Sequence, residues 1–219
     1  CTFSDRSMDG CKYLGVLRDY ATGVFKLIPV ARRTTAAIAG EIEDWVKSTR
    51  GDPVNKGRLY ELITAIKTDN EGAWRIDTAD WQDMLKDIHV NMVYCEPDRH
   101  AEENGYAESA VQTVEIVIKQ ILMANNLPPS YWQAAAADAE WLLNRFPVAS
   151  DDVAIPMDGD RSRPLEMITR GYYSRRQIDR ELGYYCAVGT PCLVHNAKVK
   201  GSSLEPKVRW EIAMGMYRE

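Results

Sequence analysis

The sequence contains no uninterrupted apolar run of membrane-spanning length, which excludes a transmembrane protein. Its five cysteines are odd in number and form no C-x-x-C pair, which argues against a zinc knuckle and against a complete disulfide framework. The three histidines stand far apart, without the spacing of metal ligands. We therefore expect an intracellular protein from a reducing compartment.

The N-terminal residues also lack the basic and apolar regions of a secretory signal, and no initiator Met precedes Cys1. We expect the chain to be a fragment of a longer protein. Of its 219 residues, 45% are hydrophobic and 27% are charged, which excludes collagen-like and wholly disordered chains. Residues 161–219 carry 11 Lys and Arg against 6 Asp and Glu, whereas the rest of the chain is acidic. This asymmetry fits a carboxylate-rich metal site beside a polyanion-binding tail, or two differently solvated surfaces.

Hydrophobic periodicity and turn residues predict the order of the secondary-structure elements. The chain is expected to begin with a meander of three antiparallel strands, at 2–4, 12–18 and 24–29. A helix at 34–51, a strand at 62–67, a helix at 78–87 and a strand at 90–94 follow it. A polar loop at 96–105 then leads to a helix at 106–126 and to a last helix, which starts at a capping box in residues 130–133 and ends near Phe146. Alternation of strands and helices after an antiparallel meander predicts a mixed α/β domain, with parallel strands added beside the meander.

The chain is expected to divide into three parts. Residues 1–148 form the α/β domain, 149–181 a linker rich in Asp, Gly and Pro, and 182–219 a small β-rich segment.

Two acidic residues are candidates for metal ligands. Asp69 follows a central strand directly, at a position where open α/β sheets form ligand sites, although an Asp there is more often a turn or cap residue. Glu108 is expected in the first turn of a long helix, where the helix dipole alone would stabilise a carboxylate. Together, the two carboxylates could converge on one metal ion.

Longer motifs carry a family resemblance. Lys67-Thr68-Asp69-Asn70 and residues 104–109, Asn-Gly-Tyr-Ala-Glu-Ser, resemble the second and third acidic signatures of retroviral and retrotransposon integrases, most closely the copia type. Asn144-Arg145-Phe146-Pro147 resembles the Asn-Arg-x-Pro that closes the copia-type core. The segments 189–195, 204–207 and 214–217 resemble the part of the polyprotein that follows it.

The resemblance implies a ribonuclease H-like fold whose two Asp and one Glu hold a pair of Mg²⁺ or Mn²⁺ ions. Asp69 and Glu108 would be two of these catalytic ligands, and oxygen donors suit such hard cations. The reactions would be 3′-end processing of element DNA and strand transfer into target DNA, in which paired metals activate one oxygen and stabilise another. The loop around Asn104 and Gly105 would close over DNA ends, with Gln112 and Lys119 as further DNA contacts.

The sequence departs from the family pattern at two places. The first family Asp would stand immediately before Cys1, so residues 1–219 alone are expected to be inactive. Asp5, Asp9 and Asp19 do not replace it, and Asp19 instead resembles the Asp of an Asp-x-x-Thr turn. The stripe expected to meet DNA is also poor in basic residues: Glu108, Gln112, Glu115 and Lys119.

Three functional hypotheses follow. The first is an integrase core that acts as a homo-oligomer on double-stranded DNA, without a membrane partner, in a cytoplasmic particle and then in the nucleus. The second is another ribonuclease H-like nuclease or transposase, and the third is a decayed or domesticated nucleic-acid-binding relic, which the acidic stripe favours. The arginines of residues 161–180 would supply phosphate contacts or a solvated surface: Arg161, Arg163, Arg170, Arg175, Arg176 and Arg180.

Overall fold

The computed structural model describes residues 1–51, 65–68, 79–94, 100–147, 163–168, 174–195 and 208–214. In chain order the elements are β1 (Tyr13–Arg18), β2 (Phe25–Val30), α1 (Thr35–Gly51), β3 (Ala65–Thr68), α2 (Ala79–Ile88), β4 (Asn91–Tyr94), α3 (His100–Ala124), the 3-10 helix η5 (Pro129–Tyr131), α4 (Trp132–Leu143), α5 (Pro164–Ile168), α6 (Arg175–Gly183), β5 (Pro191–His195) and β6 (Val208–Ile212). The fold is mixed α/β, as expected.

The strands of the described residues form three two-stranded sheets. β1 pairs with β2 antiparallel, β3 with β4 parallel, and β5 with β6 antiparallel. In the sequence α2 lies between the parallel strands β3 and β4, because parallel strands need a crossover connection.

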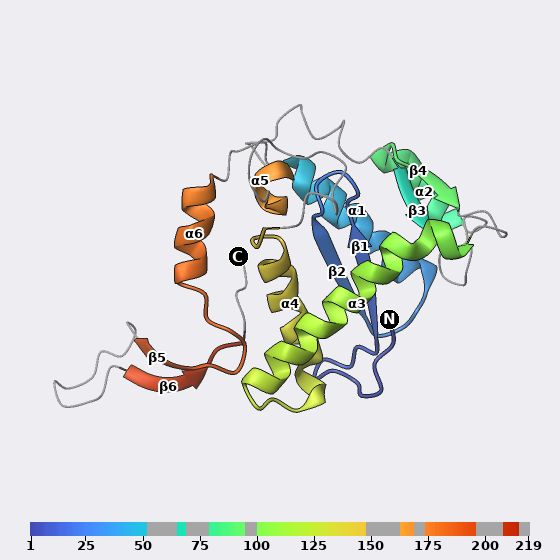
Figure 1. Ribbon diagram of the computed structural model, residues 1–219. Coiled ribbons are helices and arrows are strands. Elements are labelled where there is room, and N and C mark those ends of the chain that lie inside the picture. The colour runs from blue at the N-terminus through green and yellow to red at the C-terminus, as the bar shows by residue number, and fades with distance from the viewer. Residues whose placement is uncertain are drawn as a thin grey trace.

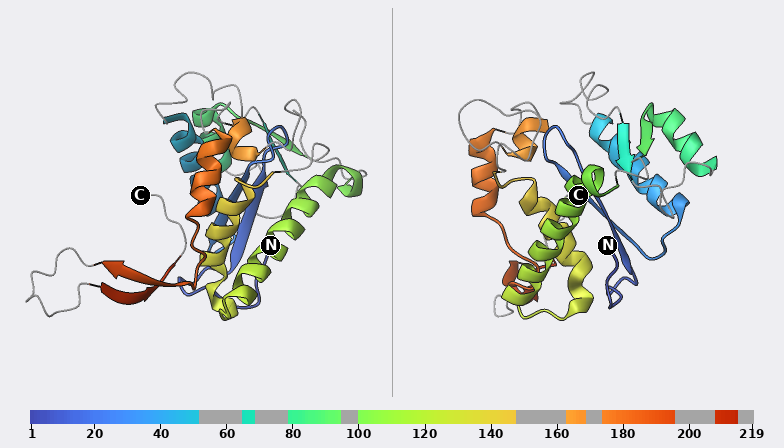
Figure 2. Two further views of the ribbon diagram at one scale, coloured as in Figure 1. Left: turned by 60° about the vertical axis from the view of Figure 1, so that its left-hand side comes forward. Right: turned by 45° about the vertical axis from the view of Figure 1, so that its right-hand side comes forward.

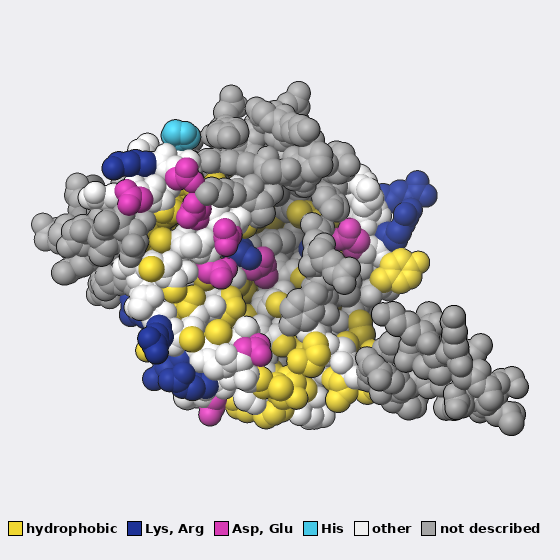
Figure 3. All heavy atoms as spheres, turned by 180° about the vertical axis from the view of Figure 1, so that it is seen from behind, with side chains coloured by type: hydrophobic (Ala, Val, Ile, Leu, Met, Phe, Trp, Pro, Cys, Tyr) yellow, Lys and Arg dark blue, Asp and Glu magenta, His cyan; other side chains and the backbone are white. Residues whose placement is uncertain are grey.

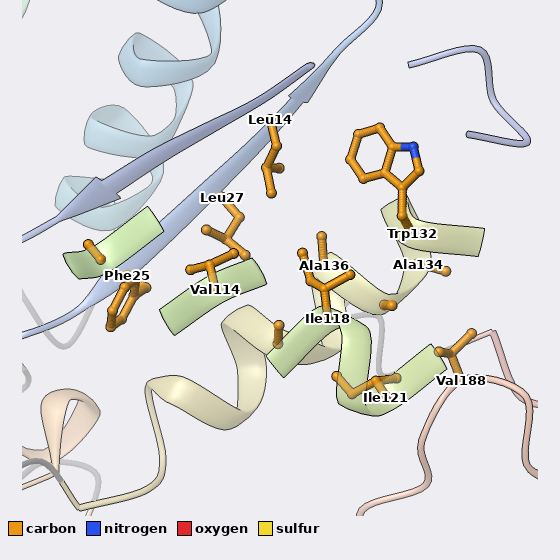
Figure 4. Packing of buried hydrophobic residues seen from close by; sticks show 13 residues of the cluster. Leu14, Phe25, Leu27, Val114, Ile118, Ile121, Trp132, Ala134, Ala136 and Val188 are labelled. Carbon is orange, nitrogen blue, oxygen red and sulfur yellow. The ribbon is translucent and has the colours of Figure 1, made fainter. Parts of the chain in front are cut away.

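The β1–β2 hairpin lies between two layers of helices. Side chains alternate along a strand, so Leu14 and Leu27 face one side, where they join a cluster with α3 and α4. Ile28 and Val30 face the other side, where they join a cluster with α1 and α2. Figures 1 and 2 show these layers, and Figure 4 shows Leu14, Leu27, Val114 and Ile118 directed into the first cluster.

The outer edge of β2 is covered by the side chains of Glu140 in α4 and of Asn144, the C-cap residue of α4. The Asn144 side chain accepts from Phe25 N–H at 2.8 Å and donates to Phe25 C=O at 2.9 Å. Glu140 accepts from Leu27 N–H at 2.7 Å. The spacing of Glu140 and Asn144 matches that of Leu27 and Phe25, because two residues four apart on a helix are separated by about 6 Å along its axis and two residues two apart on a strand by about 6.8 Å. These contacts satisfy backbone groups that an edge strand would otherwise leave open.

Most predicted elements are confirmed, and the predicted antiparallel meander is confirmed in part. Thr2 makes only an isolated antiparallel bridge to Tyr13, so residues 2–4 do not form a named strand. Phe3 N–H nevertheless donates to Lys12 C=O at 3.1 Å, which aligns this segment with β1. The three-strand sheet of a ribonuclease H-like fold is therefore not confirmed in the described residues.

The predicted capping box at Ser130 and Gln133 is wrong. Pro129 starts a 3-10 turn, which puts Ser130 inside η5, and Tyr131 is the N-cap residue of α4 without a side-chain cap. The cause is Pro129, whose fixed φ suits the first helical position and begins the turn before Ser130. The Gln133 side chain instead accepts from the Ser7 hydroxyl at 2.7 Å.

The span predicted as a linker, residues 149–181, contains α5 and most of α6 among its described residues. Met167 and Ile178 are buried there. The same Ser-x-x-Gln signature that fails at residue 130 forms a full capping box at Ser174 and Gln177, which begins α6. No described helix combines the length and the hydropathy that crossing a membrane would require.

Candidate functional site

Glu108 lies on the solvent side of α3. The opposite side of the helix is anchored in the core by Ala110, Val114 and Ile118, which are at most 1% exposed. The Glu108 side chain is exposed and forms no hydrogen bond or ion pair with any described residue. A carboxylate left without a partner on a well-packed helix is free to accept a cation or a donor from a ligand.

Asp69, the other candidate metal ligand, lies outside the described residues. β3 ends one residue earlier, at Thr68, which pairs with Tyr94 at the end of β4. The carboxyl ends of two parallel strands therefore meet at the edge where Asp69 follows. In Figures 1 and 2 the first turns of α3 lie at the same end of the molecule as β3 and β4.

The structure corrects the prediction that Asn104 and Gly105 belong to a polar loop. α3 begins at His100, so both residues are helical, and the long helix starts six residues earlier than expected. Ala101, Glu102 and Glu103 are good helix formers, and this propensity outweighs the polarity of the two glutamates, which had favoured a loop. Glu108 is consequently in the third turn of α3, where the helix dipole does not account for it.

The two further DNA-contact candidates are exposed on α3 beyond Glu108. Gln112 is exposed, with no hydrogen bond to another described residue. Lys119 forms an ion pair with Glu115, with 3.5 Å between Nζ and Oε2, and the Lys119 side chain is 67% exposed. The basic residue of the predicted stripe is therefore paired within its own helix.

A cluster of aromatic rings and one arginine fixes the N-terminal half of α3 against the β1–β2 turn. The Arg18 guanidinium lies 4.4 Å from the ring centre of Tyr106 and 5.2 Å from that of Phe25. The Tyr106 hydroxyl donates to the backbone C=O of Asp19 at 3.3 Å, and the Tyr20 ring packs edge-on against Tyr106. These contacts hold the turn of α3 that precedes Glu108.

The sequence reasoning missed this cluster, because Tyr106 lies more than 80 residues along the chain from Arg18, Tyr20 and Phe25 and shares no motif with them. It did identify the neighbouring turn: Asp19 Oδ2 accepts from Thr22 N–H at 2.8 Å and from the Thr22 hydroxyl. The interpretation of Asp19 as the first residue of an Asp-x-x-Thr turn is confirmed.

The described residues contain no group of three His, Cys, Asp or Glu side chains placed to hold a metal ion. Glu108 offers one exposed carboxylate, whose oxygen atoms have the chemistry that Mg²⁺ or Mn²⁺ requires. It fits as one ligand of such an ion, and a complete site needs donors beyond the described residues.

The Asn-Arg motif after α4 has a structural role. Asn144 covers the β2 edge, and Arg145 is only 5% exposed. Arg145 Nε donates to Glu181 of α6 at 2.8 Å, and its guanidinium lies 4.1 Å from the ring centre of Trp141. Arg145 thus connects α4 to α6.

The turn after α6 is fixed to α4 by a buried carboxyl group. Asp138, at 0% exposure, accepts from Val188 N–H at 2.6 Å and from the Tyr185 hydroxyl at 3.1 Å. Burial, and next the charge of Asp138, raise the pKa of Tyr185 above its ordinary value. The adjacent Gly189 has a φ of +87°, a conformation that favours glycine, and a Cβ there would lie 2.9 Å from a Leu127 methyl group, which would have to shift.

The described arginines of residues 161–180 fall into two groups, paired and unpaired. Arg161 and Arg170 lie outside the described residues. Arg163 and Arg175 pair with acids, at 2.7 Å to Asp179 and 3.7 Å to Glu166. Arg176 and Arg180 are exposed on α6: neither forms an ion pair or hydrogen bond within the described part of the chain.

The sequence matches no family model and no curated protein. Solved structures do resemble it. The catalytic core domain of HTLV-2 integrase, a magnesium complex in its trimeric form, has a TM-score of 0.50 and 17% identity over 76% of this chain and 88% of that chain. The core domain of BIV integrase has a TM-score of 0.50 and 13% identity over 75% and 90%.

A further match comes from the intasome of simian T-cell lymphotropic virus in complex with the PP2A regulatory subunit B56 gamma. It has a TM-score of 0.52 and 17% identity, and covers 71% of this chain and 47% of the matched chain. The chain has the fold of a retroviral integrase catalytic core. The structural similarity therefore agrees with the motif resemblance at the level of the fold.

Proposed function

We propose that this chain is the catalytic core of a copia-type retrotransposon integrase, a polynucleotidyl transferase that processes 3′ ends of element DNA and joins them to target DNA. The observation that carries the proposal is the carboxylate of Glu108, exposed and unpaired among the described residues, on α3 of an integrase-like fold. It stands in the motif segment 104–109 that resembles the third acidic signature of integrases.

Asp69 and Glu108 are the proposed ligands of Mg²⁺ or Mn²⁺. The HTLV-2 neighbour is a complex with magnesium, and carboxylate oxygens suit either cation. When bound, paired metal ions activate an oxygen nucleophile and stabilise the leaving oxygen. The chain's own part is positioning: Tyr106 and Arg18 tie α3 to the β1–β2 turn, which fixes the helix that presents Glu108.

The proposed substrate is double-stranded DNA, with Asn104, Gly105, Gln112 and Lys119 of α3 as contacts. A homo-oligomer is proposed because the neighbours are a trimeric core domain and an intasome. The proposed location is a cytoplasmic particle and then the nucleus, where the DNA substrate lies.

Metal binding tests this proposal without requiring turnover. We would titrate the full chain with Mn²⁺ and compare wild type with Glu108→Gln, Asp69→Asn and the control Glu115→Gln. Glu115→Gln is a suitable control because Glu115 also lies on α3, and because this substitution likewise replaces a carboxylate by an amide. Loss of a residue that only supports a metal ligand typically weakens metal binding about tenfold. Loss of a ligand itself should weaken Mn²⁺ binding by at least that factor in Glu108→Gln and in Asp69→Asn, and the control should bind as wild type does. Equal affinities in all four proteins would contradict the assignment.

A second candidate function is nucleic-acid binding without catalysis. One observation favours it: Lys119 is paired with Glu115, so the stripe on α3 presents no unpaired cation among its described residues. In that case Asp69→Asn would leave DNA binding the same with and without Mg²⁺. Residues 1–219 alone are expected to be inactive, so turnover is tested in a chain extended to restore the first family Asp: joining of a 3′ end into target DNA would support an integrase, and cleavage alone would support a different nuclease.

A further inference from the structure

The two acidic residues of α6 both pair with arginines from outside the helix, although the Asp179 side chain is 57% exposed. Glu181 accepts from Nε of Arg145, which follows α4, at 2.8 Å, and Asp179 accepts from Arg163 Nη2 at 2.7 Å. Their charges are therefore neutralised by arginines of other segments. The outward charge of α6 comes from its own arginines.

Arg176 and Arg180 are four residues apart, so both lie on one exposed face of α6. Like charges at this spacing repel each other and weaken a helix. Tyr184, four residues further, follows the end of α6 and is 77% exposed. The face thus presents two guanidinium groups and a phenol, all of which donate hydrogen bonds to phosphate oxygens.

α6 is a rigid support for these groups. Ile178 is fully buried beneath it, the Ser174–Gln177 capping box fixes its start, and the buried Arg145 holds its last turn. Because the helix is already ordered, a ligand need only order the side chains that project from it.

The charge on this face contrasts with that on the α1–α2 side of the molecule. The groove between α1 and α2 is lined by Glu43, Asp83 and Asp87. Figure 3 shows acidic side chains gathered over α1 and α2, and basic side chains projecting at the edge where α6 lies. A polyanion would be attracted to α6 and repelled from the α1–α2 side.

We propose that Arg176, Arg180 and Tyr184 form a docking surface for the phosphate backbone of duplex DNA. This inference rests on the proposed function and adds a contact surface to it. Arg176 and Arg180 stand about one helical turn apart on α6, on the scale of neighbouring phosphates along one strand. An Arg side chain can contact phosphate through two parallel hydrogen bonds. In Figures 1 and 2 α4 lies between α6 and α3, so this surface holds a part of the duplex away from Glu108.

The test is the salt dependence of binding to a duplex oligonucleotide, measured by fluorescence anisotropy with the full chain. We would compare wild type, Arg176→Gln with Arg180→Gln, and Arg32→Gln with Arg33→Gln. Arg32 and Arg33 are also exposed, so the control removes the same charge from another surface. Loss of two phosphate contacts should lower the slope of log K against log salt by about two and the affinity roughly tenfold at low salt. The control should keep the wild-type slope and affinity.

The possible results separate the two proposals. A wild-type chain that binds DNA, with an α6 variant that binds equally well, would overturn the α6 surface and leave the proposed function standing. Equal losses in the α6 and control variants would overturn it too, since they would show non-specific attraction. A changed oligomeric state in the α6 variant with an unchanged slope would make this face a protein contact and overturn DNA docking. A wild-type chain that binds no duplex would contradict the proposed function itself.

Discussion

α4 and the two residues that follow it carry two polar faces, which make different kinds of attachment. Toward β2, Glu140 and Asn144 bond to backbone groups of a strand edge inside the α/β domain. Toward α6, Asp138 and Arg145 bond to a segment some 36 to 50 residues further along the chain. The first face completes a sheet edge, and the second joins a later segment to the core. Variants on the two faces should therefore loosen different parts of the molecule.

The largest effect is expected from Asp138→Ala. It leaves Val188 N–H and the Tyr185 hydroxyl without their acceptor in a fully buried site, and should lower the free energy of unfolding by about 3 kcal/mol. Hydrogen exchange should rise first at residues 184–190. Asp138→Asn keeps an acceptor oxygen and should cost clearly less. Equal losses from both variants would contradict the hydrogen-bond explanation.

Asn144→Ala should act on the other face. It removes both hydrogen bonds to Phe25 and opens the outer edge of β2, at a cost of about 2 kcal/mol. Hydrogen exchange should rise along β1 and β2 and leave the turn at Val188 unchanged. Faster exchange at Val188 as well would mean that the two faces of α4 do not act separately.

Arg145→Met should have a smaller effect, of about 1 to 2 kcal/mol. Methionine keeps part of the packing on Trp141, and the Glu181 carboxylate it leaves behind is 34% exposed, so water can solvate it. Chemical unfolding measures the loss. If Arg145 only fills space, Met should match wild type.

The smallest effect concerns pH and Glu140. Burial raises the pKa of this carboxyl and outweighs Lys26 and the Leu27 N–H, which lower it. The folded state thus binds the proton more tightly, so this contribution to stability is complete below the unfolded pKa of about 4.3 and is lost as pH rises through the raised folded pKa. Over that range wild type should lose stability relative to Glu140→Gln in urea unfolding. Parallel pH profiles would show that Glu140 does not titrate abnormally.

Sequence patterns predicted the elements that have strong periodicity. The helix predicted at 34–51 is α1, and the parallel pair β3–β4 around α2 follows the predicted alternation. Errors occurred where local signals compete: the helix formers Ala101, Glu102 and Glu103 stand in a stretch predicted as a polar loop, and Pro129 overrides a capping signature. The helix at α6 was missed in a stretch that its flanking Gly and Pro residues marked as a linker.

For the candidate site, the sequence supplied the residue types and the motifs, and the structure supplied the surroundings of one of them. Glu108 is exposed on α3, although not in the first turn, and Asp69 remains a prediction outside the described residues. The Arg18–Tyr106 contact could not be predicted, because it joins positions that only the folded sheet brings together.

The sequence by itself determined the alternation of strands and helices and the turn at Asp19, because each depends on neighbouring residues and backbone conformation. Only the tertiary structure decided that Asn144 would cover a strand edge, that Arg145 would be buried against Glu181, and that Arg176 and Arg180 would be left exposed. These roles depend on which charged groups and backbone groups from distant parts of the chain come into contact, and a local sequence pattern does not specify such contacts.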